Sequence, residues 1–486
     1  MTFEIDPASC IDAFSHVGVI GYSETAVRDR LGLDDLNDLQ MRAAAIYRRQ
    51  RLAQRDPLDS AIDLFLLQGW LPTAELDRLF SRQDQEALIA CGLLEWRGGL
   101  VRALASLYPV GRDLVFSDHV SYELETNRWS AVPSDRVMYV GTDSRWLARI
   151  TSRKPVASAL DICCGSGVQA LLAASHAELV TAVDINPRAV ECTAFNAKIQ
   201  ARSNVEARLG DVYAPVGPRR FDLITANPPF VPAPVQRIGF RDGGPTGEEV
   251  QRRIVEGLPR HLSPGGTAQL VTEFGDPGAE PLEGRLRRWL GDAPMDIYVL
   301  RLRAHSAQAY AIGHAEGDAP DLMLESVGQW AANLERQSYR SIVSVLVTIR
   351  WSDGTPWTRV DEASPPTGSA GAEVEAVFAA ERLARDPGLT SRLRGSRVAC
   401  TGPVAVFQSR TFGAGVPPTI QARRLGVALS VAHELSPVEL DLLAALEQPI
   451  ATIDILAIGE RIAVPHDVVL DALVSLIRQG LVRIVQ

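Results

Sequence analysis

The sequence predicts an α/β fold for the centre of the chain, with a seven-stranded, mostly parallel sheet and helices between the strands. Two observations predict this fold. Short apolar runs rich in β-forming residues alternate with helical stretches over residues 151–352, which is typical of βαβ units. The runs are apolar along their length, which indicates strands that are buried on both faces.

Seven segments are expected to form the strands of this sheet. They are residues 158–164, 180–185, 205–211, 221–230, 266–274, 296–302 and 341–351. Helices are expected between them, for example over 187–200 and 247–262. Residues 304–341, predicted as a loop and a helix, would leave the carboxyl end of the sixth strand. Ligands bind at that edge of such sheets, so we expect this segment to cover a site.

Further domains flank this centre. The predicted organisation is a helical, winged-helix-like domain over 1–105, a connecting β segment over 106–150, the central domain over 151–352, a linker over 353–371 and a C-terminal α+β domain over 372–486. Helices predicted at 58–70 and 84–96, followed by a tight β-turn, suggest the first winged helix. Ser436 and Pro437 form a good helix start near three helices and a short final strand, which suggest a second.

Composition limits the class of protein. The 486 residues are 46% hydrophobic and 22% charged, which excludes a disordered or collagen-like chain. A net charge of −10 argues against a protein that coats nucleic acid, but it leaves a local basic patch open. No secretion signal or membrane-spanning stretch is visible, so we expect a cytoplasmic protein without membrane contact. The six cysteines and eight histidines lack metal-ligand spacing, so we expect no metal, no disulfide framework and reduced thiols.

The first candidate site residues close the first predicted strand and open the helix that follows. They read Asp161-Ile-Cys-Cys-Gly165-Ser-Gly167. Glycines at such a turn let the backbone approach a ligand closely, and the start of a helix offers free N–H groups. The segment lacks the third glycine of the dinucleotide fingerprint, which argues against NAD, and it also lacks the Gly-Lys-Ser/Thr of a phosphate-binding loop.

Two aspartates stand at the ends of the next two predicted strands. Asp184 can accept hydrogen bonds from both ribose hydroxyls of a nucleoside, or it can belong to the start of the following helix. Asp211 can meet an adenine amino group, or it can be a turn residue.

The strongest candidate is Asn227-Pro228-Pro229-Phe230, at the end of the fourth predicted strand. The nitrogen of an amide or a nucleobase amine is a poor nucleophile, because its lone pair is delocalised. A site that accepts both N–H protons, through the Asn227 side-chain oxygen and the Pro228 carbonyl, favours the pyramidal nitrogen of the transition state. Two prolines stiffen the loop, and Phe230 can stack on a flat substrate.

With these residues in this order, residues 155–303 resemble a class I S-adenosylmethionine-dependent methyltransferase with a Rossmann-like core. The similarity is to the NPPY, small-domain branch, which includes the release-factor glutamine methyltransferases and the ribosomal RNA guanine-N2 methyltransferases. The resemblance implies S-adenosylmethionine as cofactor, with Asp161 and its glycines at the methionine part, Asp184 at the ribose and Asp211 at the adenine. The implied cofactor-binding residues are Asp161, Cys163, Gly165, Gly167, Asp184, Ile185, Asp211, Val212 and Asn227, and the implied catalytic residues are Asn227, Pro228, Pro229 and Phe230.

The motifs indicate methyl transfer but do not name the substrate. Residues 241–266 are similar to the segment after NPPY in the release-factor enzymes, which with the acidic charge favours an amide on a protein or peptide. Phe230 in place of Tyr is closer to the RNA enzymes, so an exocyclic amine of ribosomal or transfer RNA (guanine N2 or adenine N6) stays open. A small-molecule natural product is a third possible substrate. A noncatalytic, cofactor-sensing DNA-binding regulator is the rival hypothesis from a different class of protein.

Two weaker signals lie before the central domain. Residues 41–51, together with Arg55, form a basic helix candidate that could contact phosphate or an acidic partner, or could be a solvated face. Asp143 precedes the first predicted strand and could cover the cofactor, or it could be a simple loop residue.

Overall fold

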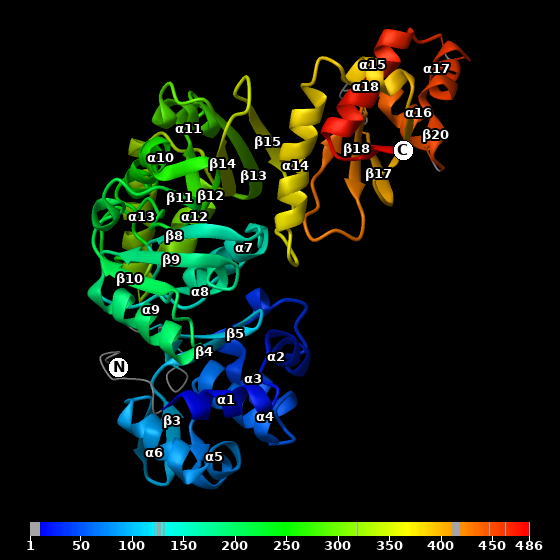
Figure 1. The fold of residues 1–486 in the computed structure, drawn as a ribbon. Coiled ribbons are helices and arrows are strands. Elements are labelled where there is room, and N and C mark those ends of the chain that lie inside the picture. Colours follow the sequence, from blue (N-terminus) through cyan, green and yellow to red (C-terminus); the bar gives the residue numbers. More distant parts are fainter. Residues whose placement is uncertain are drawn as a thin grey trace. The chain divides into compact units, whose positions relative to one another are not determined.

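The computed structural model describes residues 10–120, 122–123, 128–129, 132–317, 319–410, 418–446, 448–461 and 463–485. The chain forms two compact units (Figure 1). The first comprises Met1–Ala148, Arg153–Val299 and Arg303–Arg359, and the second comprises Arg149–Ser152, Leu300–Leu302 and Val360–Gln486.

The first unit contains most of an eight-stranded mixed sheet with the order β10-β9-β8-β11-β12-β14-β13-β15. Its strands are β8 (Val156–Ile162), β9 (Ala177–Asp184), β10 (Val205–Leu209), β11 (Phe221–Ala226), β12 (Leu262–Asp276), β13 (Met295–Ser306), β14 (Ser341–Trp351) and β15 (Thr358–Glu362). The strands from β10 to β12 pair in parallel, whereas β14 runs antiparallel to β12. This arrangement is the α/β, Rossmann-like core that the alternating pattern predicts.

The predicted count of seven strands needs a correction. Each of the seven predicted segments overlaps one strand of the sheet, and the eighth strand is β15. This strand lies inside residues 353–371, which we predicted as a linker. Its sequence, Thr-Arg-Val-Asp-Glu, is too polar to stand out as an apolar run, as is common for strands at the edge of a sheet.

Helices connect the strands of the core (Figure 1). They are α8 (Val168–Ala173), α9 (Pro187–Ile199), α10 (Glu249–His261) and α11 (Leu282–Leu290), followed by α12 (Ala307–His314) and α13 (Pro320–Arg336). The last two occupy the segment 304–341, where we predicted one helix. Asn186 caps α9 by accepting a hydrogen bond from the Arg188 N–H, and Pro187 fills the first turn, where its missing N–H costs nothing.

The described N-terminal residues form six short α-helices and three small sheets. The helices are α1 (Ile11–Val19), α2 (Glu24–Leu31), α3 (Ala44–Gln50), α4 (Pro57–Ala61), α5 (Thr73–Leu79) and α6 (Arg82–Ala90), and α7 (Thr142–Ile150) leads into the core. The strands are β1 (Leu71–Pro72), β2 (Leu94–Arg97), β3 (Leu100–Ala103), β4 (Ser106–Val110), β5 (Asp113–Ser117), β6 (Tyr122–Glu123) and β7 (Arg128–Trp129), in sheets of order β1-β3-β2, β4-β5 and β6-β7. Two predicted helices end early: 58–70 continues from α4 only as a π-helical turn over Ile62–Leu66, and 84–96 changes to strand β2.

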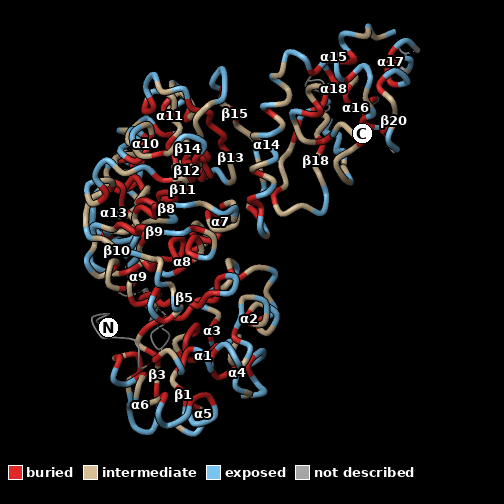
Figure 2. The backbone as a smooth tube through the Cα atoms, viewed as in Figure 1, coloured by how far each residue is buried: buried red, intermediate tan, exposed pale blue. Residues whose placement is uncertain are grey.

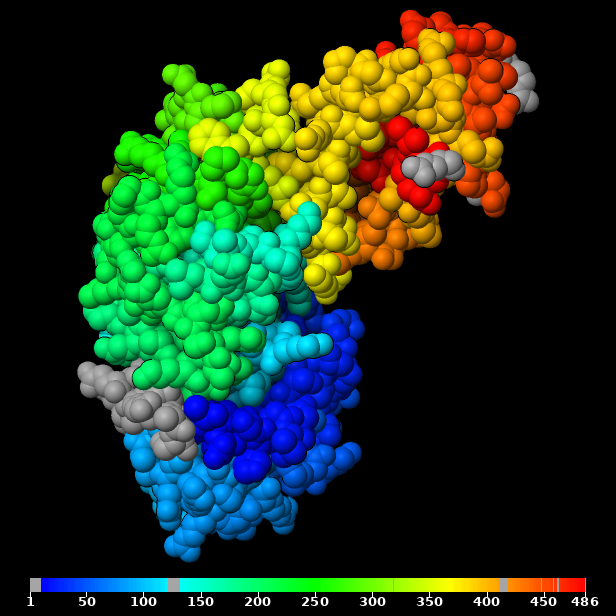
Figure 3. Space-filling model, in the orientation of Figure 1, coloured from blue at the N-terminus to red at the C-terminus, as the bar shows by residue number. Residues whose placement is uncertain are grey.

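A single hydrophobic core joins the N-terminal helices to helices α8 and α9, which pack on the central sheet. Phe116 of β5 makes edge-to-face contacts with three other phenylalanines. The ring centroids lie 4.8 Å from Phe14 of α1, 6.3 Å from Phe65 of the π-helical turn and 5.9 Å from Phe195 of α9. The buried Asn196 side chain exchanges hydrogen bonds with the Phe116 backbone, as a neighbouring strand would. Figure 2 shows buried segments at both β5 and α8, and Figure 3 shows the blue N-terminal residues against cyan and green ones.

The second unit has its own hydrophobic core. Its helices are α14 (Gly371–Ala384), α15 (Leu389–Arg394), α16 (Pro437–Ala445), α17 (Thr452–Arg461) and α18 (His466–Arg478). Its strands are β16 (Arg397–Cys400), β17 (Val404–Ser409), β18 (Thr419–Arg424), β19 (His433–Glu434), β20 (Ile450–Ala451) and β21 (Val482–Val485), in sheets of order β20-β16-β21 and β17-β18-β19. The predicted start of α16 is confirmed, because Ser436 and Glu439 form a capping box and Pro437 occupies the first turn.

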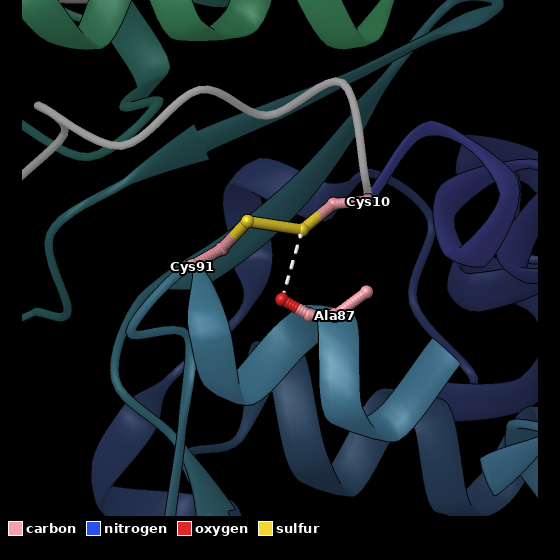
Figure 4. The surroundings of a disulfide bond; sticks show 3 residues. All are labelled: Cys10, Ala87 and Cys91. Atoms are coloured by element: carbon pink, nitrogen blue, oxygen red, sulfur yellow. Dashed lines mark hydrogen bonds between the residues drawn. A yellow bond between two sulfur atoms is a disulfide. The ribbon is translucent and has the colours of Figure 1, made fainter. Parts of the chain in front are cut away.

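The expectation of reduced thiols is wrong for one pair of cysteines. Cys10 and Cys91 form a disulfide that joins the start of α1 to the end of α6, with the Cys10 sulfur 3.2 Å from the Ala87 carbonyl oxygen (Figure 4). The two residues are 81 positions apart, so no local motif reveals the pairing. The other four cysteines are free thiols.

Within the described residues, no cluster of three or more His, Cys, Asp and Glu is placed to hold a metal ion. Every helix of that part of the chain is too short or too polar to cross a bilayer.

Candidate active site

A cavity of about 490 Å³ lies where β8, β9, β10 and β11 end. The predicted site residues that line it are Asp161, Cys163, Gly165, Asp184, Ile185, Asp211, Val212, Asn227 and Pro229. Gly167, Pro228 and Phe230 do not line it. The parallel register explains the gathering, because the carboxyl ends of neighbouring strands meet at one edge of the sheet.

The two glycines of the turn after β8 have different roles: Gly165 faces the cavity, whereas Gly167 packs against α9. Gly165 has a φ of +54°, and a side chain built there would meet open space, so the backbone is accessible from the cavity. Gly167 has a φ of +79°, and a Cβ there would lie 2.8 Å from Cγ2 of Thr193. Gly167 therefore lets α8 start close to α9, and its contribution to a ligand site is indirect.

Asp161 is a buried carboxylate at the end of β8. One of its oxygens accepts a hydrogen bond from the Thr225 hydroxyl at 3.0 Å, and the other accepts from the Ala170 N–H at 3.2 Å. Burial raises the pKa of Asp161 to about 7, because the charged form loses its hydration and the two hydrogen bonds compensate only in part. A cation in the cavity would favour the ionised form.

Asp184 and Asp211 differ in their surroundings. The Asp184 carboxylate accepts hydrogen bonds from the backbone N–H groups of Gly165 and Asn186, each at 2.9 Å, and burial raises its pKa. Asp211 forms a half-exposed ion pair with Arg253 at 2.6 Å. Arg253 also lines the cavity, so it is a site residue that the sequence motifs did not reveal.

Asn227 is held by two residues of α7. Its Nδ2 donates to the Asp143 carboxylate at 3.1 Å and to the Ser144 hydroxyl at 3.1 Å. A carboxylate only accepts hydrogen bonds, so the NH₂ group of the amide must face Asp143. The side-chain oxygen of Asn227 consequently points away from this pair, and among the described residues it has no hydrogen-bond partner.

The residues after Asn227 are held in place by α12 and α13. Phe230 packs against a cluster that contains Tyr310 and Trp330, so it does not face the cavity where we expected it to stack on a substrate. Asn333 of α13 donates hydrogen bonds to the Pro232 and Pro245 carbonyls, each at 3.0 Å. The 304–341 segment thus supports the loop over 231–247, which contributes Gln236, Gly239 and Phe240 to the cavity lining.

Gln169 is a second lining residue that no motif indicated. It is 4% exposed, and its Nε2 donates to the Ser144 carbonyl at 2.7 Å. Its Oε1 is buried and lacks a hydrogen-bond partner among the described residues. A buried acceptor without a partner in a cavity wall is costly unless a bound donor satisfies it.

Two cations of the predicted basic helix, Arg48 and Arg55, form ion pairs within the protein. Arg48 forms an ion pair with Asp63 at 2.5 Å, and Arg55 approaches the other oxygen of the same carboxylate at 3.3 Å. These two cations therefore support the N-terminal fold.

A comparison with known protein families agrees with the arrangement of the cavity residues. Residues 138–289 match the family model described as the methyltransferase small domain. This part of the chain is a class I methyltransferase domain of the small-domain branch, as the motifs predict. A second model, described as a domain of unknown function (DUF7059), matches residues 19–104.

Among curated proteins, the more specific similarity is to glutamine methyltransferases. The ribosomal protein uL3 glutamine methyltransferase of Bradyrhizobium diazoefficiens is 38% identical over 151 residues, which cover 28% of this chain and 46% of that protein. The release factor glutamine methyltransferase of Geobacter sulfurreducens is 35% identical over 151 residues, or 28% of this chain and 52% of that protein. The chain thus spans about half the length of these relatives.

The chain is also similar to an RNA methyltransferase and, in fold, to a ribosomal protein methylase. The ribosomal RNA small subunit methyltransferase C of Klebsiella pneumoniae is 34% identical over 118 residues, which cover 23% of this chain and 30% of that protein. Among solved structures, a ribosomal protein L11 methylase from Lactobacillus delbrueckii is 19% identical with a TM-score of 0.26, over 43% of this chain and 77% of that one.

Proposed function

We propose that this protein transfers a methyl group from S-adenosylmethionine to the side-chain amide nitrogen of a glutamine in a protein substrate. The observation that carries the proposal is the orientation of Asn227, which leaves its oxygen free to accept an N–H from a planar NH₂ group. The names of the glutamine methyltransferase relatives favour an amide over other planar nitrogens.

The cavity suits S-adenosylmethionine. Asp184 lies where a carboxylate can bind the ribose hydroxyls, and Asp211 with Arg253 lies at the end of β10, where the adenine would sit. The buried Oε1 of Gln169 offers an unsatisfied acceptor for the ammonium group of the methionine part, with Asp161 as a nearby anion. When bound, the cofactor supplies an electrophilic methyl group on a cationic sulfur.

The residues of the chain act mainly by positioning. The Asn227 oxygen would accept one amide proton from within the cavity. By resemblance to the family, the carbonyl of Pro228, a residue that does not itself line the cavity, would accept the other. Two such acceptors favour the pyramidal nitrogen whose lone pair is available for in-line attack. Pro228 and Pro229 keep these acceptors fixed, which lowers the entropy that the reaction must lose. The nitrogen loses its proton after methyl transfer, so Asn227 need not ionise.

The N-terminal domain is proposed to select the acceptor protein. A second cavity, of about 550 Å³, is lined by residues from 36–42 and by residues from 139–145, the segment that holds Asn227. Asn37 contributes a buried Oδ1 without a hydrogen-bond partner in the described residues. A peptide backbone N–H would satisfy it, and a peptide bound there would bring a neighbouring side chain towards Asn227. We retain the winged-helix-like assignment of both terminal domains as part of this proposal, with protein contact as their role.

An exocyclic amine of RNA is the second candidate, because the Klebsiella relative is named for ribosomal RNA. Incubation of the protein and of Asn227→Ala with cell extract and methyl-labelled S-adenosylmethionine separates the two candidates. Label in protein, lost in the variant, supports the proposal, whereas label in RNA, with RNA binding that weakens steeply with salt, supports the second candidate. Asn227→Ala with unchanged transfer would contradict both.

A further inference from the structure

We propose that Asp143 and Ser144 are positioning residues that fix the Asn227 amide with its oxygen towards the substrate nitrogen. The inference rests on the proposed function, since it assigns how the acceptor of the amide proton is oriented. It adds two residues, both outside the Asn-Pro-Pro-Phe motif, to the machinery of the site.

The need for such a device follows from the shape of an amide. The oxygen and NH₂ ends of an asparagine side chain have nearly the same size, so packing alone does not distinguish them. If the NH₂ end faced the substrate, it would meet the NH₂ group of the acceptor, donor against donor. The amide must therefore be held one way round by groups that recognise its ends chemically.

Asp143 and Ser144 provide that recognition. The Asp143 carboxylate accepts from Asn227 Nδ2 at 3.1 Å, and the rotated amide would place oxygen against oxygen there. The Ser144 hydroxyl accepts from the same nitrogen at 3.1 Å, so both N–H groups of the amide are used. The remaining oxygen is the only end of the side chain that is left for a substrate.

Asp143 and Ser144 are themselves fixed by hydrogen bonds from neighbouring residues. Asp143 also accepts a hydrogen bond from the Ser144 N–H at 2.8 Å, within the first turn of α7. A Cβ at Gly141 would lie 2.7 Å from the second carboxylate oxygen, so glycine is needed for the carboxylate to sit there. Gln169 of α8 fixes the Ser144 carbonyl at 2.7 Å and ties this turn to the helix that begins at the cofactor cavity.

The first test compares single variants in the full-length protein. Asp143→Asn keeps the size of the side chain, but its amide can present either an oxygen or an NH₂ group to Asn227, so the Asn227 amide is no longer held one way round. The kcat for labelling the protein acceptor found in cell extract should therefore fall about 10- to 100-fold, the range for a lost hydrogen bond to a charged group. Ser144→Ala should lower kcat less, and Ser144→Thr, which keeps the hydroxyl, should restore it. The Kd for S-adenosylhomocysteine, measured by calorimetry, should stay within about twofold of wild type in all three, since neither side chain is assigned to the cofactor.

A matched control and an exchange variant make the test specific. Asp12 is the second residue of α1, as Asp143 is the second residue of α7. Asp12→Asn therefore controls for the loss of a carboxylate in the first turn of a helix, and it should keep full activity. The double variant Asp143→Asn/Asn227→Asp restores a donor–acceptor pair with an acceptor towards the substrate, so it should exceed either single variant about tenfold or more.

The outcomes separate this inference from the proposed function. The inference is overturned if Asp143→Asn and Ser144→Ala both retain kcat within about twofold while Asn227→Ala is inactive. Equal losses of kcat and of S-adenosylhomocysteine binding, without recovery in the exchange variant, would also overturn it, because they indicate general damage to the site. If Asn227→Ala itself retains full transfer, the proposed function fails first.

Discussion

Removal of the Asp161 charge should make the protein more stable and bind S-adenosylmethionine less well. The buried carboxylate has a pKa of about 7 against an ordinary value of 3.8, so ionising it in the empty cavity costs free energy. A pKa that is raised on folding stabilises the folded state fully below pH 3.8, and this contribution is lost as the pH rises through 7. Asp161→Asn removes the cost at pH 8.

The size of the effect follows from the contacts of the side chain. The shift from 3.8 to about 7 corresponds to about 4 kcal/mol at high pH. Asparagine can still accept from the Thr225 hydroxyl, but its NH₂ group faces the Ala170 N–H, and that lost hydrogen bond costs about 1 kcal/mol. Asp161→Asn should therefore raise the free energy of unfolding by at most about 3 kcal/mol at pH 8 and lower it slightly at pH 4.

Cofactor binding should change in the opposite direction. If a cationic cofactor binds the ionised form of Asp161, a free-protein pKa of about 7 makes the affinity about tenfold weaker at pH 6 than at pH 8. Calorimetric titration of wild type and Asp161→Asn with S-adenosylmethionine at both pH values measures this, and urea unfolding measures the stability. A wild-type affinity that does not change with pH, or a variant that is destabilised at pH 8, would refute the reasoning.

Three further predictions concern the other parts of the site and the core. Asp184→Ala should weaken S-adenosylmethionine binding at least tenfold by calorimetry, and unchanged binding would remove Asp184 from the cofactor site. Asn227→Ala should abolish methyl transfer with the cofactor Kd within about twofold, because its oxygen is assigned to the acceptor nitrogen; a large loss of cofactor binding would argue against that role. Phe116→Ala should lower the free energy of unfolding by about 3–5 kcal/mol in urea, and the N-terminal helices should unfold together with the central sheet, since they share one core. Separate transitions for the two parts would contradict the shared core.

Most of the sheet was predictable from sequence because its six inner strands, β8, β9 and β11–β14, contain apolar runs, and the edge strand β10 follows a predicted helix in the βαβ order. A continuous apolar run bounded by turn residues is enough to predict a strand that is buried on both faces. The polar edge strand β15 has no such pattern, and its place depends on pairing with a strand that is distant in sequence. The same is true of the Cys10–Cys91 disulfide and of Phe116, whose partners come from three separate elements.

The candidate site was predictable where its residues follow strand ends. Asp161, Asp184 and Asn227 stand at those positions, so the topology alone brings them to one cavity. Gln169 and Arg253 lie inside helices, where nothing in the local sequence distinguishes a cavity residue from a buried or solvated one. The sequence indicates Asp143 only as a residue before the first predicted strand that could cover the cofactor, because its contact with Asn227 joins α7 to a residue 84 positions away.

The most direct measurement locates the transferred methyl group. The protein, methyl-labelled S-adenosylmethionine and cell extract are incubated, and the labelled macromolecule is isolated, digested and sequenced by mass spectrometry. The proposed function predicts one extra methyl group on the side-chain nitrogen of a glutamine in a protein, present with the wild-type enzyme and absent with Asn227→Ala. A methyl group on an RNA base, or on a protein group other than a side-chain amide, would contradict it.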